Sequence, residues 1–390
     1  MFTFGPFHLD VQERRLLRDG ALVPLSGKAF DTLVALVEGA NTLQRQQALM
    51  ERLWPDTVVE PNSLQYNVSL VRRVLDGAAG VEIQTLRGQG YRLIAEVVRT
   101  HAHAPRSHVA QRTHFCKAGD GARLAFAKLG DGRPIVKAAN WLSHVELDWH
   151  GDVWTTWLEL LGRERCLVRY DARGNGLSDW HPPTITFDDF VSDLGVVFDA
   201  AAVERAPIIG ICQGASVAVA YAARQPERVS ALVLVGGCAR GWRVKGHPRL
   251  VERFEALMVL MRQGWGGRNA AFRQIFTTAF FPNATAELAE SWNELQRQTT
   301  TPDNAANILS ALGDIDIRSD MARIRVPTLV LHSKDDAVVP MSDGVELATG
   351  IAGARFVPLD SPNHLLVPDD PTWPRVAAEI DSFLTQETLR

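Results

Sequence analysis

The stretch that most constrains the fold lies in the middle of the chain, where an apolar run ends in a glycine-flanked cysteine. Residues 206–211 read Ala-Pro-Ile-Ile-Gly-Ile, residues 210–214 read Gly-Ile-Cys-Gln-Gly, and residues 215–224 favour a helix. Gly210 and Gly214 leave space for a sharp turn between strand and helix, which lifts the central side chain above a sheet. The pattern therefore predicts a strained turn that presents Cys212 as a nucleophile.

Short apolar segments alternate with helical ones beyond residue 115, which predicts a mostly parallel sheet covered on both faces. The expected strands are 124–129, 135–138, 166–170, 207–211, 231–235, 328–331 and 356–358. Helical segments fill most of the interval between residues 235 and 326, at 248–262, 269–280, 285–297 and 304–312. We expect this interval to form a helical cap, about residues 239–320, that closes over Cys212.

A carboxylate and a histidine follow the cysteine in chain order. Asp336 lies in the loop after the expected strand 328–331, with Asp335 as the alternative acid, and His364 lies past the next strand. In this arrangement His364 takes the thiol proton or pairs with the thiolate, and Asp336 fixes the imidazole. The sequence thus predicts a triad of Cys212, His364 and Asp336, although an isolated Gly-x-Cys-x-Gly would equally suit a structural cysteine.

Further site residues are expected around this triad. The backbone N–H of Gln213 would form half of an oxyanion hole, and Trp141, in the loop after strand 135–138, is the expected second donor. Tryptophans concentrate in the loops and the cap rather than in the strands, which suggests an aromatic-lined ligand pocket or ordinary cap packing. We predict that His144 and Trp242 contact the ligand, with a supporting role for His144 as the alternative.

The first hundred residues follow a different pattern. Apolar residues at helical spacing predict three helices. The first lies in the segment 25–37, with Ser26 as its N-cap, and the others span 43–53 and 62–75. Residues 81–94 then read as a hairpin, with Gly88 and Gly90 at the turn. The polar face of the third helix carries Asn62, Gln65, Asn67, Ser69, Arg72 and Arg73.

These motifs resemble a known family. The segments Leu-Trp-Pro-Asp, Asn-Ser-Leu, Val-Arg-Arg-Val-Leu and Arg-Gly-Gln-Gly-Tyr-Arg make residues 1–98 similar to OmpR/PhoB-type winged-helix effector domains, which have an α+β fold. The resemblance implies that helix 62–75 enters the major groove of double-stranded DNA and that the hairpin forms a wing. The implied DNA-binding residues are Asn62, Ser63, Gln65, Asn67, Arg72, Arg73 and Arg87. Asn67 and Gln65 would read base edges or be merely solvated.

The C-terminal part also resembles a family. Residues 138–149 and the Asp-x-Arg-Gly-x-Gly-x-Ser-Asp stretch at 171–179 are similar to the α/β-hydrolase domains attached to bacterial cyclases and regulators. The resemblance covers roughly 115–390 and implies an α/β-hydrolase fold with a helical cap, whose triad follows the order nucleophile, acid, histidine. The nucleophile in that family is usually serine, so Cys212 is a departure.

Composition and charge limit the remaining possibilities. The chain of 390 residues is 46% hydrophobic and carries a formal charge of −4, which predicts two globular domains and excludes a uniformly basic nucleic-acid binder. Residues 1–98 contain ten Lys and Arg against eleven Asp and Glu, a net charge of −1, so we expect modest non-specific DNA affinity and a homodimer. Loss of DNA binding, leaving a protein-interaction domain, is the alternative.

Residues 99–114 read as a flexible linker that contains four histidines without thiolate or carboxylate companions, so no metal site is expected there. The four cysteines form no Cys-x-x-Cys pair and suggest free thiols in a reducing cytoplasm. We expect no cofactor, no metal and no membrane span.

The combination predicts a cytoplasmic one-component transcriptional regulator. Its hydrolase-like domain would sense a small apolar acyl or carbonyl compound, and slow turnover at Cys212 would reset the signal. The alternative is an active cysteine hydrolase or acyltransferase, acting on an ester, lactone or thioester, with an accessory DNA-binding domain. A third possibility is a redox or electrophile sensor, which leaves Asp336 and His364 without a role.

Overall fold

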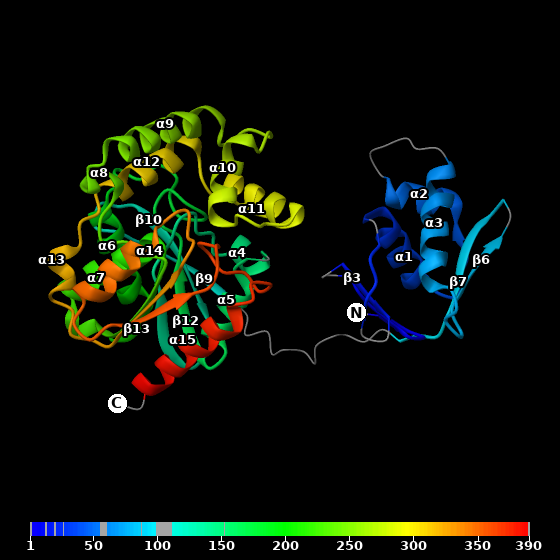
Figure 1. The fold of residues 1–390 in the computed structure, drawn as a ribbon, viewed down its shortest axis with the longest axis horizontal. Coiled ribbons are helices and arrows are strands. Elements are labelled where there is room, and N and C mark those ends of the chain that lie inside the picture. The colour runs from blue at the N-terminus through cyan, green and yellow to red at the C-terminus, as the bar shows by residue number, and fades with distance from the viewer. Residues whose placement is uncertain are drawn as a thin grey trace. The chain divides into compact units, whose positions relative to one another are not determined.

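The computed structural model describes residues 2–11, 14–18, 21–25, 27–54, 61–86, 88–98, 111–151 and 153–388. The chain divides into two compact units, Met1–His108 and Val109–Arg390 (Figure 1). No helix in these described stretches is both long and apolar enough to cross a membrane.

Three helices form the core of the first unit. They are α1 (Gly27–Glu38), α2 (Gln46–Leu53) and α3 (Pro61–Leu75). Apolar side chains recur along α3 at helical spacing, so that Leu64, Val68 and Val71 are buried together against α1. Hydrophobic burial on this one stripe leaves the rest of α3 at the surface of the unit.

Two small sheets flank the helices. Five strands follow the order β4-β3-β2-β1-β8, with β1 (Phe2–Phe4), β2 (Phe7–Asp10), β3 (Arg15–Arg18), β4 (Ala21–Leu22) and β8 (Val97–Val98). Three more follow the order β5-β7-β6, with β5 (Gln44–Arg45), β6 (Glu82–Leu86) and β7 (Gly90–Ile94). The second helix was predicted to begin at residue 43, but Gln44 and Arg45 pair with β7 and the helix begins at Gln46.

Gly90 explains the close fit of the hairpin on β5. A side chain at this position would place its Cβ 2.0 Å from the carbonyl oxygen of Gln44, so only glycine permits the pairing. The predicted hairpin over residues 81–94 is present as β6 and β7, paired antiparallel from Glu82–Ile94 to Leu86–Gly90. Arg87 and the Ser26 cap lie outside the described residues.

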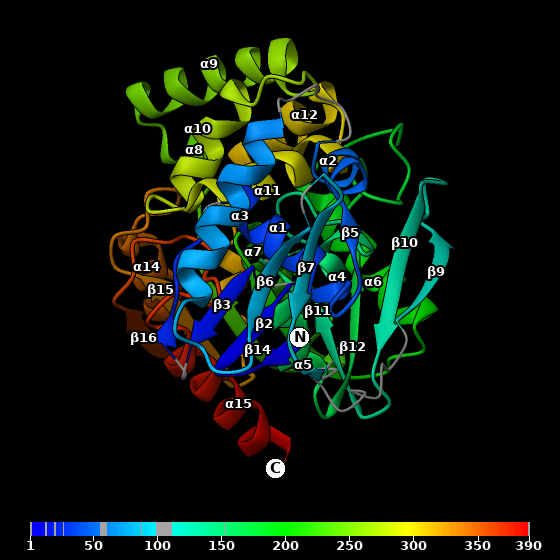
Figure 2. The same ribbon diagram turned by 90° about the vertical axis from the view of Figure 1, so that its right-hand side faces the viewer.

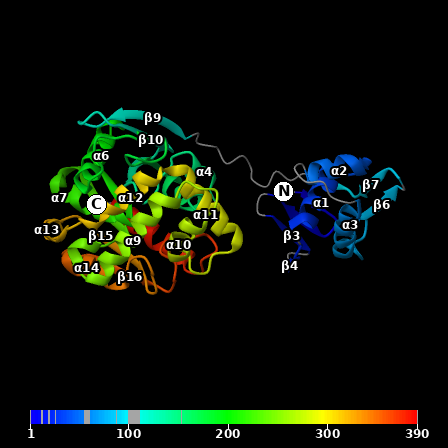
Figure 3. The same cartoon turned by 90° about the horizontal axis from the view of Figure 1, so that it is seen from above.

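An eight-stranded sheet forms the centre of the second unit. Its order is β16-β15-β14-β13-β11-β12-β10-β9. The strands are β9 (Arg112–Lys117), β10 (Arg123–Leu129), β11 (Arg133–Lys137), β12 (Arg165–Tyr170), β13 (Ala206–Ile211), β14 (Val229–Val235), β15 (Thr328–Ser333) and β16 (Arg355–Leu359). β10 pairs antiparallel with β9 and β12, and the other neighbours are parallel. Figure 2 shows β9 and β10 side by side, and Figure 3 shows β9 and β16 at opposite edges.

Helices cover the sheet and carry a cap. The flanking helices are α4 (Leu147–His150), α5 (Thr155–Gly162), α6 (Phe187–Ala200), α7 (Gln213–Arg224), α13 (Arg318–Met321), α14 (Met341–Gly350) and α15 (Trp373–Thr388), with a short 3-10 turn η1 (Pro226–Arg228) after α7. The cap comprises α8 (Trp242–Lys245), α9 (Pro248–Gly264), α10 (Ala271–Phe280), α11 (Ala286–Thr299) and α12 (Pro302–Gly313), gathered at one end of the sheet (Figure 1). The predicted alternation of strands and helices and the α/β-hydrolase fold are therefore confirmed.

The start of the second unit differs from the expected linker. Residues 112–114 were predicted to belong to a flexible connector, but they form the first half of β9 and pair with β10. His114 stacks on Phe126, with ring centroids 5.2 Å apart. The sequence did not predict β9, because this edge strand is exposed to solvent and contains few apolar residues. The other three histidines of the linker lie outside the described residues.

Candidate active site and candidate nucleic-acid interface

Cys212 occupies a strained turn between β13 and α7. Its backbone has φ 54° and ψ −126°, a conformation that non-glycine residues rarely adopt and that concentrates at functional sites. A Cβ on Gly210 would lie 2.4 Å from the carbonyl oxygen of Gly214, so the turn is too tight for a side chain there. The backbone N–H of Cys212 donates to Val235 at 2.9 Å, which fixes the turn beside the end of β14.

His364 and Asp336 form a buried pair. Nδ1 of His364 lies 2.7 Å from Oδ2 of Asp336, and the side chains are 1% and 0% exposed. The other oxygen of Asp336 accepts the backbone N–H groups of Val338 and Val339, whereas the neighbouring Asp335 is exposed. The geometry therefore selects Asp336 over Asp335 as the partner of His364.

The imidazole of His364 lies beside the elbow. A Cβ on Gly236, directly after the strand residue that binds the Cys212 backbone, would be 3.2 Å from Cε1 of His364. Nε2 of His364 is buried, and the imidazole interacts with the side chain of Cys212 as well as with Asp336. Because Asp336 occupies Nδ1, Nε2 is the nitrogen left to exchange a proton with Cys212.

Opposing effects set the charge of this pair. Burial disfavours the imidazolium form of His364, but the charges of Asp336 and Cys212 and the hydrogen bond to Asp336 outweigh burial and raise the pKa of His364 to about 10. Burial likewise favours the protonated form of Asp336, yet the charge of His364 holds the pKa of Asp336 below its ordinary value. Both shifts favour an imidazolium–carboxylate ion pair.

A second histidine, which the sequence reasoning missed, lies against the same acid. Nε2 of His332, at the end of β15, is 3.7 Å from Asp336 and 2.8 Å from the carbonyl oxygen of Val339. Burial lowers the pKa of His332, so this ring is neutral and donates to Val339. The only sequence signal was a histidine at the end of an otherwise apolar strand.

The loop that carries His364 is anchored from both sides. Its backbone N–H donates to the carbonyl oxygen of Phe280 at 2.9 Å, and the Phe280 ring contacts the imidazole edge to face at 4.8 Å. On the other side, the carboxylate of Asp370 accepts hydrogen bonds from the side chains of Ser361 and Asn363. The end of cap helix α10 therefore helps to fix the position of the histidine.

The expected oxyanion loop runs directly over the elbow. A Cβ on Gly214 would lie 3.0 Å from the carbonyl oxygen of Ala139, which brings the residues after β11 against the first turn of α7. Trp141 follows in this loop and is 4% exposed, and Gln213 begins α7. Nε1 of Trp141 and Oε1 of Gln213 are both buried without a hydrogen-bond partner among the described residues.

Buried charges hold this loop from beneath. Nζ of Lys137 donates to Asn140, whose amide nitrogen donates to the carbonyl oxygen of Trp141 at 2.9 Å. Burial lowers the pKa of Lys137 to about 8. Asp148 pairs with Arg169 at 3.5 Å and also accepts the backbone N–H of His144. These contacts fix the loop without any side chain from the cap.

The two predicted ligand residues are both engaged in internal contacts. Nδ1 of His144 accepts backbone N–H groups from Glu146 and Leu147, and burial, followed by the charge of Arg169, lowers the pKa of His144 to about 4. Trp242 donates its indole N–H to Leu309 at 3.1 Å and stacks on Phe254 at 5.3 Å. These contacts place His144 in the loop framework and Trp242 in the cap, and their ligand roles stay predictions.

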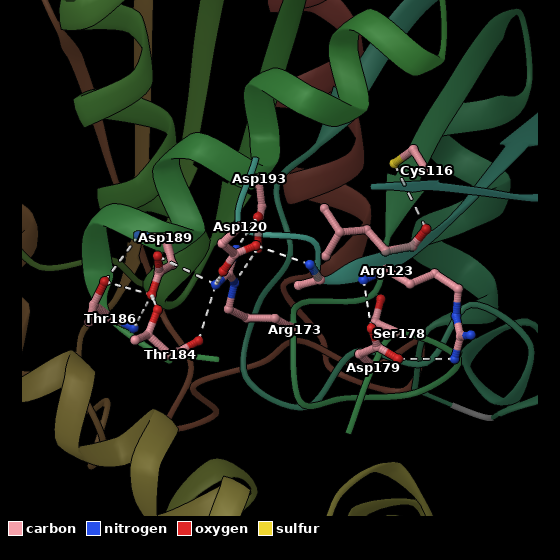
Figure 4. Close-up of polar contacts among 12 residues, drawn as sticks. Cys116, Asp120, Arg123, Arg173, Ser178, Asp179, Thr184, Thr186, Asp189 and Asp193 are labelled. Atoms are coloured by element: carbon pink, nitrogen blue, oxygen red, sulfur yellow. Dashed lines mark hydrogen bonds and ion pairs between the residues drawn. The ribbon is translucent and has the colours of Figure 1, made fainter. Parts of the chain in front are cut away.

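The Asp-x-Arg-Gly motif organises the loop after β12. The guanidinium of Arg173, 2% exposed, binds both oxygens of Asp193 at 2.7 and 2.8 Å and Asp120 at 2.7 Å (Figure 4). Figure 4 also shows Ser178, which bridges this loop to β10 by accepting the N–H of Ala125. Asp171 accepts the backbone N–H groups of Val145 and Leu177 and so ties the motif to the oxyanion loop.

Aromatic side chains join the oxyanion loop to the cap. Trp141 stacks on Phe276 at 5.8 Å and contacts Trp265 edge to face at 6.0 Å. Phe280, one turn after Phe276 on α10, contacts Trp292 of α11 at 5.8 Å. We call these five residues the aromatic layer. The predicted concentration of aromatic residues is therefore present, although only Trp141 and Trp265 came from the tryptophans considered.

In the first unit, the exposed side of α3 carries several of the side chains that were predicted to bind DNA or to form its polar face. Gln65, Ser69 and Arg73 are exposed, Ser63 is half-buried, and Asn62 lies in the first turn. Tyr66, which the sequence reasoning passed over, is 64% exposed. The available sequence signal was a tyrosine between two polar residues of the helix.

Asn67 does not match the expected surface of α3, whereas Arg72 is exposed but also makes a contact within the unit. Asn67 was placed on the polar face, but it is 7% exposed and donates to the carbonyl oxygen of Ser63 at 2.8 Å. The reason is helical periodicity, since Asn67 lies one turn from both Leu64 and Val71 and shares their buried stripe. Arg72 donates to the carbonyl oxygen of Ile83, so its guanidinium ties α3 to the β6–β7 hairpin.

Comparison with known proteins identifies the family. Residues 146–371 match the model of the alpha/beta hydrolase fold family, and residues 20–93 match that of "Transcriptional regulatory protein, C terminal". The first match spans more than half of the chain, and the chain therefore belongs to the alpha/beta hydrolase fold family. The second match indicates a DNA-binding module of a transcriptional regulator in that segment.

Individual relatives cover the second unit. The AB hydrolase superfamily protein YisY of Bacillus subtilis is 25% identical over 256 residues, 64% of this chain and 92% of the relative. The 3-oxoadipate enol-lactonase 1 of Acinetobacter baylyi is 27% identical over 217 residues, 55% of this chain and 77% of the relative. The crystal structure of a hydrolase from Pseudomonas aeruginosa superposes with a TM-score of 0.58 at 26% identity, covering 70% of this chain and 98% of that one.

Metal ligands do not cluster in the described stretches, where no group of three or more His, Cys, Asp or Glu side chains could hold a metal ion.

Proposed function

We propose that the protein is a one-component transcriptional regulator whose hydrolase-like unit recognises a small acyl or carbonyl compound through Cys212. The first unit acts as a winged helix in this proposal, with α3 in the major groove and the β6–β7 hairpin as the wing. In this proposal residues 1–98 bind DNA, the linker after them ends before β9 at Arg112, and the hydrolase-like unit follows. The regulator acts as a homodimer in the cytoplasm.

The chemistry proposed for Cys212 is acyl transfer to sulfur. The thiolate adds to the carbonyl carbon of an ester, and the backbone N–H groups of Gln213 and Trp141 stabilise the oxyanion. The C–O bond then breaks, the departing alkoxide takes the proton from Nε2 of His364, and a thioester remains on Cys212. A water molecule then attacks the thioester while Nε2 of His364 takes one of its protons; the C–S bond breaks, the acid leaves, and the thiolate of Cys212 and the imidazolium of His364 are restored.

The pair of His364 and Asp336 beside a strained Cys212 is the observation that carries this proposal. A cysteine with only a structural role would need neither the positive φ of 54° nor a buried ion pair whose second nitrogen lies next to the elbow. The match of residues 20–93 to a transcriptional regulatory family supports the DNA-binding half.

A single mixing experiment tests the chemical half. The purified protein is mixed with 4-nitrophenyl acetate, and released 4-nitrophenol is followed together with the intact mass of the protein. One equivalent of chromophore with an acetyl adduct that is absent from Cys212→Ala supports a slowly resetting sensor. Absence of both chromophore and adduct in a protein that keeps its native circular dichroism would reject Cys212 as the nucleophile.

An active cysteine hydrolase is the second candidate, because the chain is similar to proteins named as hydrolases and as an enol-lactonase. In that case the same experiment gives sustained release of chromophore, and the first unit only regulates or positions the enzyme.

A further inference from the structure

The aromatic layer extends from the elbow loops into the cap without interruption. Trp141 stacks on Phe276, Phe276 and Phe280 share one face of α10, and Phe280 contacts both His364 and Trp292. The edge of His364 thus meets an aromatic ring at 4.8 Å on the side of the cap. A flat aromatic group on the acyl part of a ligand would find matching surfaces here.

Two polar atoms within this region are buried without partners in the described chain. Trp292 is 1% exposed and Gln296 is 0% exposed, yet Nε1 of Trp292 and Oε1 of Gln296 make no hydrogen bond. The two residues are one turn apart and therefore lie on the same face of α11. Buried polar groups in native proteins nearly always have a partner, so each of these atoms requires a ligand or a water molecule.

A chain of hydrogen bonds fixes which atom Gln296 offers. Oγ1 of Thr277 donates to Oδ1 of Asn293 at 2.7 Å, and Nδ2 of Asn293 donates to Gln274 at 2.6 Å. With its hydrogen engaged, Oγ1 of Thr277 accepts the amide nitrogen of Gln296 at 2.9 Å. Gln296 therefore presents an acceptor, whereas Trp292 presents a donor.

A hydroxyl group matches the chemistry of both atoms, because it can donate to an acceptor such as Oε1 of Gln296 and accept from a donor such as Nε1 of Trp292. A carboxylate would accept from Trp292 but would meet the oxygen of Gln296 with no hydrogen to share. The pair of atoms thus favours a neutral ligand.

Resting on the proposed function, we propose that the ligand is an uncharged aromatic acyl compound with a hydroxyl group on its ring. Its carbonyl carbon lies at Cys212, its ring lies in the aromatic layer, and its hydroxyl group binds Trp292 and Gln296. Acylation follows the steps given above and leaves a hydroxyaroyl thioester on Cys212.

The test compares 4-nitrophenyl benzoate with the 2-, 3- and 4-hydroxybenzoate esters. Single-turnover acylation of Cys212 is measured by 4-nitrophenol release and intact mass, and each rate is divided by the rate with a small thiol in solution. We expect one hydroxylated isomer to react on the order of 100-fold faster than the benzoate, because sites built for a hydroxyl group reject analogues that lack it. Trp292→Phe, which keeps a ring but removes the N–H, should reduce this ratio at least about tenfold.

Trp54→Phe is the matched control, since Trp54 lies in the first unit beside Lys28 and should leave the ratio unchanged. Binding is measured separately by calorimetry on Cys212→Ala with the three hydroxyacetophenones and acetophenone. Tighter binding of a hydroxylated ketone without acylation of the wild type would support the subsite and reject the nucleophile. Acylation without any preference for hydroxylated esters would overturn the subsite and assign the two polar atoms to water. Failure of both measurements would reject both proposals.

Discussion

His364 gives the site a pH dependence whose sign follows from its environment. Its pKa rises from the ordinary value of 6.5 to about 10 on folding, so the imidazolium form is stabilised by Asp336 and Cys212. A raised pKa contributes stability that is fully present below 6.5 and is lost as the pH rises through about 10. We expect the free energy of unfolding to fall across this interval, and to fall less steeply in His364→Gln. Urea titrations at several pH values measure this, and parallel curves for the two proteins would contradict the ion pair.

The ion pairs of Arg173 and Arg224 should contribute very differently to the free energy of unfolding. Arg173 is buried and binds Asp193, which is 0% exposed, whereas Arg224 and its partner Asp188 have side-chain exposures of 40% and 77%. Arg173→Met should destabilise the second unit by roughly 3–5 kcal/mol, because it leaves a buried carboxylate without its cation. Arg224→Met, the matched control, should cost at most about 1 kcal/mol. Denaturant unfolding decides, and equal effects would show that the Arg173 network is not structural.

The sequence predicted the neighbours of some site residues but not the burial or the hydrogen bonding of others. Cys212, Asp336 and His364 could be predicted as a triad because each follows a strand in a fixed order, and parallel strands bring their carboxyl ends to the same end of a sheet. Asn67 was misplaced because a polar side chain can turn onto the buried stripe and bond its own helix. Nothing in the sequence could show that Nε1 of Trp292 has no hydrogen-bond partner among the described residues, since this depends on how α10 and α11 pack.

At the scale of elements, the turn before α7 allows a sharp test. In Gly210→Ala the new Cβ would lie 2.4 Å from the carbonyl oxygen of Gly214, and backbone atoms cannot move aside without opening the turn. We expect a loss of roughly 1–3 kcal/mol in stability, as for overpacked sites, together with slower alkylation of Cys212. Gly119→Ala has no atom within 4 Å of its Cβ and should change stability by less than about 0.5 kcal/mol. Wild-type stability in Gly210→Ala would mean that the turn is looser than described.

Two neighbouring arginines of α3 are expected to have different roles, one in DNA binding and one in holding the β6–β7 hairpin. Arg73 is exposed, whereas Arg72 donates to the carbonyl oxygen of Ile83 and to the hydroxyl of Thr85. Arg73→Ala should weaken operator binding and reduce the slope of log K against log salt by about 1, the value of one phosphate contact. Arg72→Ala should mainly destabilise the hairpin. Fluorescence anisotropy over a range of salt concentrations distinguishes them, and an unchanged slope in Arg73→Ala would remove this residue from the interface.

Strands of the large sheet were predictable where they are buried on both faces, because such strands are almost continuously apolar. β14 and β15 are examples, with nearly every residue buried. The edge strand β9 has mostly exposed residues, and β5 has only two residues, so neither carries a hydrophobic period that a single sequence could reveal. β9 forms because it pairs with β10, and β5 forms because it pairs with β7.

At the scale of the whole molecule, the two family matches place a transcriptional-regulator segment and a hydrolase fold in one chain. If the second unit recognises an acyl compound as proposed, coupling between the two units is the central expectation. A ligand changes operator affinity only by as much as it binds the DNA-bound and free states differently. We expect acylation of Cys212 to change the operator dissociation constant by at least about fivefold, the lower end of typical coupling energies. Anisotropy titrations of the full chain, before and after stoichiometric acylation, measure this change. Cys212→Ala treated with the same ester corrects for reaction at other thiols. An acylated protein that binds its operator as the free protein does would leave an acyl-transfer enzyme carrying a DNA-binding module, because a thioester without coupling cannot act as a signal.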